Sequence, residues 1–492
     1  MEPRAGAHVA LVISCALGVV AAFLPIVREW GFTVDDALIT ARVAANIAHG
    51  FGHRFNTHGP VVDAVTPLGF EYLLAPFAKQ GPLAAMYFAK WIGGASGLVA
   101  GALLGRAIGR SDVVVRAAPP VDRATDDVPN RQAGARRFLP YLALVPLALS
   151  APFGAWCDAG METGLVVLLA TAAITVRSPG SLLSAGLAAA LRPELCPWAA
   201  TLLVGYLVTT RPSRRRAALS TAFVVGPPLV VALVRLSWFG HAAPLSFFAK
   251  PSDAEHGLRY VLGALIWTGA PALVVAPWTF RRLDARSRVV LVAAMVHAAA
   301  LVVAGGDWMT LFRLFVPMLP GLLLVGARVL ALSSLWSSLV RWGVAVGTSA
   351  VLFANTGAVA RRVLASRLAL IDAARPVLAG HRRVAALDVG WVGAATDADV
   401  VDLAGVTDEI VARFPGGHTS KRIPERFLES RNVDVLVLLA ESPLDGALDD
   451  TRFARAVEAR AAREAAGSGF RFQAALPLAG TTQKYLVYER KE

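Results

Sequence analysis

Residues 33–66 read TVDDALITARVAANIAHGFGHRFNTHGPVVDAVT, a polar stretch that comes directly after the first long apolar run of the chain. It opens with two adjacent carboxylates, Asp35 and Asp36, and continues as a segment of helical pattern that carries Arg42. A turn rich in glycine and histidine and a third acid, Asp63, follow. A membrane protein with many spans does not need such a polar patch in order to fold. We therefore expect this stretch to hold the functional site.

The composition around this stretch is that of an integral membrane protein. The 492 residues are 55% hydrophobic and 17% charged, whereas soluble domains carry about a quarter charged residues. Uncharged runs such as Val9–Val27, Phe138–Cys157 and Val289–Gly306 are long enough to cross a hydrocarbon core of about 30 Å as helices. The net charge of +13 could indicate nucleic-acid binding, but the arginines cluster between apolar runs, as the positive-inside rule predicts.

The distribution of charge predicts the topology. The arginine-rich blocks 106–137, 211–216 and 281–288 all fall on one side of the predicted membrane, and the segments with paired acids fall on the other. We predict about eleven spans with the N-terminus in the cytoplasm and the C-terminus outside. The apolar runs behind this count are Val9–Val27, Pro82–Leu104, Phe138–Trp156, Gly164–Val176, Leu182–Val208, Ala217–Val234, Tyr260–Trp278, Val289–Ala304, Leu314–Leu330 and Trp342–Ala360.

Two of the apolar runs carry breaks. Leu182–Val208 is interrupted by Arg192-Pro193-Glu194, which predicts two shorter helices that meet at the outer face. Pro67–Lys79 is short, aromatic and interrupted by Pro76, so we expect a helix lying on the outer membrane surface.

The composition changes near Arg361 to that of a soluble domain. We therefore divide the chain into a transmembrane domain, residues 1–360, with its catalytic first outer loop at 28–81, and an extracytoplasmic α/β domain, residues 361–492. RVAALDVGWVGAA (383–395) and VDVLVLLA (433–440) predict strands. Residues 452–465 have helical periodicity, and FRFQAAL (470–476) and KYLVYER (484–490) predict two closing strands.

The paired aspartates have two interpretations. Asp is favoured at helix N-caps, and ALITARVAANIAHG looks helical, so the first interpretation is that the pair is only a structural cap. A carboxylate held next to an acceptor hydroxyl can also act as a general base. One aspartate can cap while the other reacts, and we favour Asp36 slightly as the base.

Three basic residues in the polar outer segments could hold an anion. Lys250 and Arg313 are cations at the edge of apolar runs, where a lipid phosphate would compensate their charge. The alternative is that both side chains extend to the surface. For Arg192 the alternative is a local ion pair with Glu194 or packing between helices.

Metal chemistry is weakly indicated. His49, His53 and His58 lie among glycines that break any regular ligand spacing, so a zinc site is disfavoured. A divalent cation between Asp35, Asp36 and a donor phosphate is the metal site left open. The sequence has no glycine-rich phosphate loop, nucleophile elbow or CxxC pair, and we expect no firm cofactor.

The chain resembles the GT-C membrane glycosyltransferases, in particular the mycobacterial terminal β-arabinofuranosyltransferases and their bacterial relatives. The resemblance rests on an ordered set of segments spread over most of the chain. These are DDALITARVAANIAHGFGHRFN (35–56), GMET (160–163), LRPE (191–194), WFGHAAPLSFFAK (238–250), GGDWMTLFRLFVPMLP (305–320) and DVGWVGAATDADVVDLAGVTD (388–408).

This resemblance implies an inverting transferase in a bacterial plasma membrane that takes a sugar, for example a pentofuranose, from a polyprenyl-phosphate donor. The acceptor would be an envelope glycan, lipid or protein on the outer face. The resemblance implies that Asp35 or Asp36 is the base and that Lys250 and Arg313 hold the donor phosphate. Further binding or supporting residues would be Arg192, Arg42, Asp307, Glu162 and His241.

Two other function classes stay open. A transporter or flippase of lipid-linked sugars would show repeated halves and charges at the membrane midplane, and the sequence shows neither. A non-catalytic membrane partner with the same fold would tolerate replacement of both Asp35 and Asp36.

Overall fold

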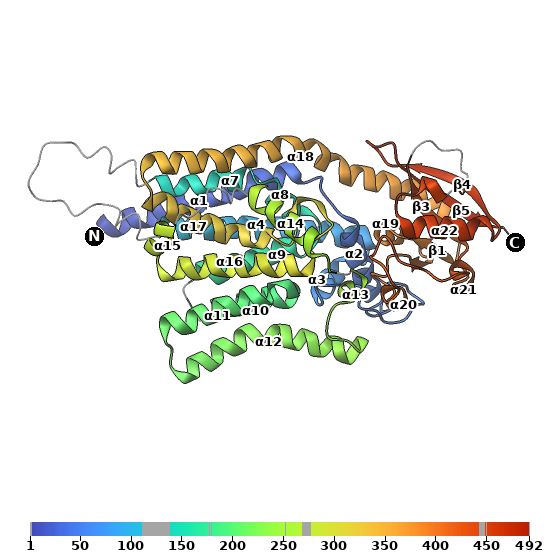
Figure 1. Cartoon of the computed structure of the whole chain (residues 1–492), viewed down its shortest axis with the longest axis horizontal. Helices are drawn as coiled ribbons and strands as arrows, with labels where there is room; N and C mark the ends of the chain where they lie inside the picture. Colours follow the sequence, from blue (N-terminus) through green and yellow to red (C-terminus); the bar gives the residue numbers. More distant parts are fainter. Residues whose placement is uncertain are drawn as a thin grey trace, which may run out of the picture. The chain divides into compact units, whose positions relative to one another are not determined.

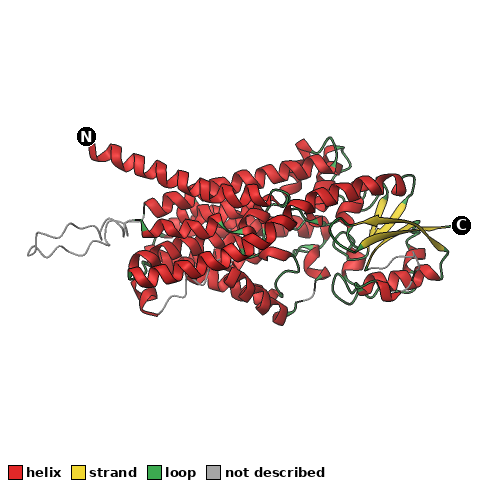
Figure 2. Ribbon diagram, turned by 90° about the horizontal axis from the view of Figure 1, so that it is seen from above, coloured by secondary structure: helices red, strands yellow, loops and turns green. Residues whose placement is uncertain are grey.

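The computed structural model describes residues 2–110, 138–176, 178, 180–250, 252–267, 277–441, 448 and 450–491. The predicted cytoplasmic loop 106–137 therefore lies mostly outside the described residues, and so does the second half of the predicted span Tyr260–Trp278. The described chain is mostly helical, with several long apolar helices and a small C-terminal sheet (Figures 1 and 2).

The chain forms two compact units. The first consists of Met1–Trp30, Trp91–Leu229 and Asp253–Val359, and the second of Gly31–Lys90, Val230–Ser252 and Ala360–Glu492. The helices α4 (Pro82–Gly109), α12 (Arg214–Phe239) and α18 (Leu335–Leu378) each have residues in both units. The polar stretch 33–66 belongs to the second unit, together with the C-terminal sheet.

The other elements of the first unit are all helices. They are α1 (Glu2–Glu29), η2 (Leu139–Ala143), α7 (Leu144–Ala148), α8 (Ala151–Asp158), α9 (Thr163–Thr175), α10 (Ser181–Leu191), η3 (Pro193–Leu195), α11 (Cys196–Thr210), α14 (Ala254–Trp267), α15 (Pro277–Arg282), α16 (Ala285–Ala304), η5 (Thr310–Phe312), η6 (Val316–Met318) and α17 (Leu319–Leu332).

Five described helices are long and apolar enough to cross a membrane: His8–Glu29, Pro82–Gly109, Arg214–Phe239, Ala285–Ala304 and Trp336–Leu378. The pair Leu139–Ala148 and Ala151–Asp158 passes the same test together but is bent by 55°. Thr163–Thr175, Ser181–Leu191 and Val316–Leu332 are shorter apolar helices. The predicted count of about eleven spans and its orientation stay predictions.

The predicted break at Arg192-Pro193-Glu194 is confirmed. Helix α10 ends at Leu191 and Arg192 has an extended backbone (φ −136°, ψ 93°), after which the chain restarts as η3 and α11. The residue before a proline is sterically excluded from the helical region, which explains why the turn falls at this position.

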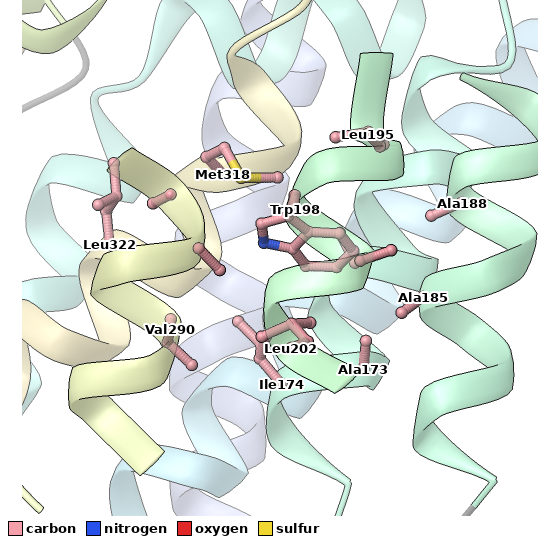
Figure 3. Close-up of a cluster of buried hydrophobic side chains, with 14 of the residues drawn as sticks. Ala173, Ile174, Ala185, Ala188, Leu195, Trp198, Leu202, Val290, Met318 and Leu322 are labelled. Carbon is pink, nitrogen blue, oxygen red and sulfur yellow. The ribbon is translucent and has the colours of Figure 1, made fainter. Parts of the chain in front are cut away.

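The core of the first unit is built on Trp198, which is 2% exposed. Figure 3 shows its indole among apolar side chains of α9, α10, α16 and the α17 region, with small residues such as Ala185 and Ala188 on the neighbouring helix. Close contacts between helices also depend on glycine. A Cβ atom on Gly18 of α1 would lie 2.0 Å from the carbonyl oxygen of Gly101 on α4, so the two backbones pack directly together.

The second unit contains the sheet and several short helices. Its helices are α2 (Asp35–Ala48), α3 (Phe70–Leu74), η1 (Ala75–Phe77), α13 (Leu245–Ala249), α19 (Val389–Ala395), α20 (Glu409–Ala412), α21 (Phe427–Ser430), η7 (Asp450–Arg452) and α22 (Ala456–Ala466). Its strands are β1 (Arg383–Ala386), β2 (Asp399–Asp402), β3 (Val435–Ala440), β4 (Phe470–Pro477) and β5 (Lys484–Arg490).

The five-stranded sheet has the order β2-β1-β3-β5-β4. Strand β1 pairs in parallel with β2 and β3, whereas β5 pairs antiparallel with β3 and β4. The predicted buried strand at 433–440 is confirmed as β3, and the two closing strands are confirmed as β4 and β5. The helix predicted at 452–465 is confirmed as α22, although it begins four residues later.

The strand predicted over 383–395 is wrong in its second half. Strand β1 ends at Ala386, and Val389–Ala395 forms helix α19. Two glycines make this segment a poor helix former by itself. Tertiary contacts override that preference, because Val389, Trp391 and Val392 are completely buried and α19 packs on α2.

The segment predicted as one helix over Pro67–Lys79 is shorter than expected. It is helical only from Phe70 to Phe77, as α3 followed by the 3₁₀ turn η1, which contains Pro76. The missing N–H group of a proline interrupts the α-helical hydrogen-bond pattern there.

Candidate functional site

The two aspartates begin helix α2 but do not cap it. The N-cap residue is Val34, which has an extended backbone (φ −135°, ψ 161°) and contributes no side-chain hydrogen bond. Asp35 and Asp36 both lie in the first turn, where the positive end of the helix dipole favours negative charge. The interpretation of the pair as a local N-cap of this helix is therefore wrong.

Asp35 instead binds the start of another helix. Its Oδ2 accepts a hydrogen bond from the backbone N–H of Gly390 at 2.7 Å, and its Oδ1 accepts one from that of Trp391 at 2.9 Å. These are N–H groups of the first turn of α19, which have no partner within their own helix. Burial raises the pKa of Asp35 to about 6, although the two N–H groups act in the opposite direction.

The contact between α2 and α19 is tight. A Cβ atom on Gly390 would lie 2.1 Å from the backbone oxygen of Asp35 and 2.8 Å from its Oδ2. Trp391 is completely buried, and its ring lies 4.7 Å from that of Tyr485 on β5. Asp388, just before α19, accepts hydrogen bonds from Arg455 and from the Tyr485 hydroxyl, both at 2.7 Å. The position of Asp35 is thus fixed by the C-terminal domain.

Gly390→Ala is expected to lower the stability of the protein by at least about 2 kcal/mol, because the added methyl group must displace backbone. The matched control is Gly467→Ala at the end of α22, where φ is −92° and the nearest atom to an added Cβ is 3.8 Å away. Thermal unfolding of the two purified variants measures the difference. Equal melting temperatures for both variants would show that α2 and α19 do not pack as described.

Asp36 lies beside Asp35 in a different setting. Both residues are partly buried, and the backbone oxygen of Asp36 accepts the Thr40 hydroxyl at 3.4 Å within α2. The cap on α19 is completed by Asp35 through both of its carboxylate oxygens. The structure therefore distinguishes two carboxylates that are adjacent and chemically identical in the sequence.

Arg42, predicted to bind substrate, is buried and bound to backbone. Its guanidinium donates to the carbonyl oxygens of Phe55 at 2.9 Å, Gly393 at 2.6 Å, Thr396 at 3.0 Å and Ala398 at 2.8 Å. Burial lowers its pKa to about 10. These four contacts tie α2 and its following turn to the end of α19, so the geometry gives Arg42 a structural role.

His241 belongs to a buried group around Asp63. The Oδ2 atom of Asp63 accepts hydrogen bonds from Arg235 Nε at 3.0 Å and from the Leu245 backbone N–H at 3.2 Å, and lies 4.0 Å from Nδ1 of His241. The His241 Nδ1 atom also lies 2.6 Å from the carbonyl oxygen of Ala243. Burial raises the pKa of Asp63, and Arg235 opposes that effect.

Arg235 was missed by the sequence analysis. It is 1% exposed and also donates to the backbone oxygens of Val65 and Thr66. The available signal was an arginine at the end of the apolar helix α12, a position that requires a partner.

Lys250 follows the short helix α13. Its side chain is partly exposed, and within the described part of the chain no carboxylate or other acceptor contacts its ammonium group. Lys250 belongs to the same unit as Asp35 and Asp36. Lys250 therefore differs from Arg192 and Arg313, because its charge is not paired with a carboxylate of the described chain and can bind a phosphate.

Four further residues predicted to bind or support the substrate form buried ion pairs in the first unit. They are Arg192, Glu162, Arg313 and Asp307. Arg192 Nε lies 2.5 Å from Glu162 Oε1, and a weaker contact of 3.4 Å joins Arg192 to Glu194. Arg313 Nε lies 2.8 Å from Asp307 Oδ2. The local pair of Arg192 with Glu194 is present, but Glu162 is its closer partner.

The two ion pairs are neighbours. The Arg313 guanidinium lies 3.7 Å from the sulfur of Met161, the residue before Glu162, and 5.6 Å from the centre of the Trp156 ring. The loop before Arg313 has Leu311 and Phe312 in the left-handed region, with φ of 61° and 56°, which is uncommon for bulky residues. Backbone strain of this kind concentrates at functional sites.

The three histidines do not form a metal site. His53 is buried, with Nδ1 3.4 Å from Glu71, whereas His49 bonds to Ala45 of its own helix and His58 is exposed. No group of three or more His, Cys, Asp or Glu side chains in the described ranges is arranged to hold a metal ion. A cation between Asp35, Asp36 and a donor phosphate stays a prediction, because each Asp35 oxygen that accepts an N–H group keeps a second lone pair.

Comparison with known proteins gives one match. The family described as a domain of unknown function, DUF8728, matches residues 361–488, which contain α19, β1 to β4 and most of β5. Comparisons with the curated proteins and with the solved structures gave no match.

Proposed function

We propose that this chain is a GT-C type inverting glycosyltransferase that moves a sugar from a polyprenyl-phosphate donor to an envelope glycan, lipid or protein acceptor. The observation that carries the proposal is the fixed position of Asp36 at the start of α2, next to Asp35. Asp35 is bound to the backbone of α19, which holds the neighbouring Asp36 on a fixed first turn. A general base needs this kind of fixed position.

The proposed reaction needs one base and one cation. Asp36 takes the proton of the acceptor hydroxyl. At the same time the oxygen of that hydroxyl forms a bond to the anomeric carbon of the sugar. The bond from that carbon to the phosphate oxygen breaks, and polyprenyl phosphate leaves with the electron pair. The leaving group is already an anion, so it requires positive charge and no acid.

The geometry favours Lys250 over the two arginines as the ligand of the donor phosphate. Arg192 and Arg313 are each neutralised by a buried carboxylate, Glu162 and Asp307. We assign these two pairs to shaping and supporting the first unit. Lys250 supplies an ammonium group in the same unit as Asp36.

Lys250→Met is expected to raise the KM for the lipid donor by about tenfold or more, because a charge-assisted hydrogen bond to phosphate is lost. Lys250→Arg keeps the charge and should recover most of the affinity. The measurement is the initial transfer rate against donor concentration in vesicles. Equal KM values for the wild type and Lys250→Met would remove Lys250 from the donor site.

The localisation in the proposal follows the charge distribution of the sequence. We place the protein in a bacterial plasma membrane with about eleven spans, the N-terminus inside, and the second unit facing the periplasm or exterior. The C-terminal domain would hold α2 in position through Asp35 and Arg42, in addition to any contact with acceptor.

The deciding experiment uses the purified protein in vesicles with a radiolabelled polyprenyl-phosphate sugar. A transferase converts the donor to polyprenyl phosphate and labelled acceptor. A flippase would move the labelled lipid between leaflets without consuming it, and a non-catalytic partner would do neither. Donor that stays intact in the presence of a cell-envelope acceptor extract would contradict the proposal.

A further inference from the structure

We propose that the first unit has a second binding site, for a phosphate-bearing anion, in a cavity of about 450 Å³ near the ends of α4, α9, α16 and α17. This volume falls within the range of about 300–1,000 Å³ typical of small-molecule sites. Four arginines line the cavity: Arg106, Arg110, Arg286 and Arg328. The proposal is independent of the proposed transferase activity.

Two of these arginines are held in place by the protein. Arg286 donates to the carbonyl oxygens of Ile174 at 2.7 Å and Val176 at 3.2 Å, at the end of α9. Arg328 forms an ion pair with Asp284 and donates to the Ser287 hydroxyl at 2.5 Å. Their guanidinium groups are therefore held in position at the cavity. These two side chains lose little conformational entropy when a ligand binds.

Arg106 lines the cavity and has an unpaired N–H group. Its Nε atom is shielded from water, and in the described part of the chain it has no hydrogen-bond partner. Buried N–H groups in proteins are almost always paired, so such a group requires an explanation, for example a bound anion. Arg110, the residue directly after α4, is exposed and lies among the lining residues.

The charges of the lining residues indicate which class of ligand the cavity would bind. The lining residues include four guanidinium groups and no carboxylate, and the nearest acid bonded to them is Asp284. Guanidinium groups arriving from three helices suit an anion with several oxygens, and phosphate matches their planar fork. Leu103, Ile174 and Leu324 complete the lining and would suit the apolar part of a lipid.

The phosphate could come from a lipid headgroup or from a free phosphate. Basic pockets between membrane helices bind the phosphate headgroups of anionic lipids. Two arginine-rich segments predicted to face the cytoplasm, 106–137 and 281–288, each contribute to this cavity through Arg106, Arg110 and Arg286. That agreement favours the inner leaflet as the source.

The test measures binding to the full-length protein in neutral detergent. The probes are dihexanoyl phosphatidic acid, inorganic phosphate and, as an uncharged-headgroup control, dihexanoyl phosphatidylcholine. Arg106→Gln and Arg110→Gln are each expected to weaken binding of phosphatidic acid by about tenfold. Arg288→Gln, an exposed position on α16 that does not line the cavity, is the matched control and should bind like the wild type.

The binding results distinguish a lipid headgroup from free phosphate as the ligand. Binding of both phosphatidic acid and inorganic phosphate, weakened by the cavity variants, supports a site for phosphate from either source. Binding of phosphatidic acid alone supports the lipid. Absence of binding, equal binding of phosphatidylcholine, or an equal loss in Arg288→Gln would overturn the proposal. Arg110 is exposed, so its variant keeps the test valid even if Arg106→Gln does not fold.

Discussion

Asp36→Asn is expected to lower the rate of sugar transfer by about 10³-fold while the protein remains folded. The amide keeps the size of the side chain but cannot accept the proton of the acceptor hydroxyl. Because Asp35, and not Asp36, accepts the N–H groups at the start of α19, the replacement should lower the melting temperature less than Asp35→Asn does. The measurement is the initial transfer rate in vesicles at equal protein content.

Asp35→Asn is the matched control for this prediction, and its effect should appear in stability. An asparagine can accept from one of the two N–H groups of Gly390 and Trp391 through its carbonyl oxygen, but it turns an NH₂ group toward the other. Leaving a buried N–H unpaired costs about 1–3 kcal/mol. If Asp35→Asn were folded but inactive and Asp36→Asn were active, Asp35 and not Asp36 would be the base.

The sequence makes the α2 region a candidate for the functional site because its polarity conflicts with the apolar surroundings, and this assignment stays a prediction. It could not show what Asp35 binds, since the two N–H groups lie about 355 positions away and backbone donors leave no mark in a sequence. An aspartate was predicted to accept N–H groups at the start of its own helix, α2. Asp35 accepts such N–H groups, but they belong to α19. Only the tertiary fold brings α19 to α2.

The role predicted for Arg42 stays a prediction, but its observed contacts could not be read from the sequence for a related reason. A basic side chain on a polar helix face suggests an anion ligand, whereas the fold surrounds it with four backbone carbonyls. Strands β3, β4 and β5 were predictable because each is a local run of strand-forming residues. Residues 389–395 were not, since their helix depends on burial against α2.

Arg235→Met is expected to destabilise the protein by about 3–5 kcal/mol, because it leaves the Asp63 carboxylate buried without its cation. Asp63 is 3% and Arg235 1% exposed, so water cannot replace the lost partner. The same arginine binds the backbone oxygens of Val65 and Thr66, and Asp63 also accepts the N–H of Leu245. The loop before α3 and the start of α13 therefore depend on one ion pair.

The matched control is Arg259→Met, which breaks an ion pair with Glu255 whose side chains are 76% and 75% exposed. Exposed pairs of this kind contribute little, so the melting temperature should hardly change. The double variant Arg235→Met with Asp63→Leu removes both buried charges and should recover much of the stability lost in the single variant. If Arg235→Met melted like Arg259→Met, Asp63 would have to be solvated in solution. The loop that leads into α13 and Lys250 would then be held by something other than this pair.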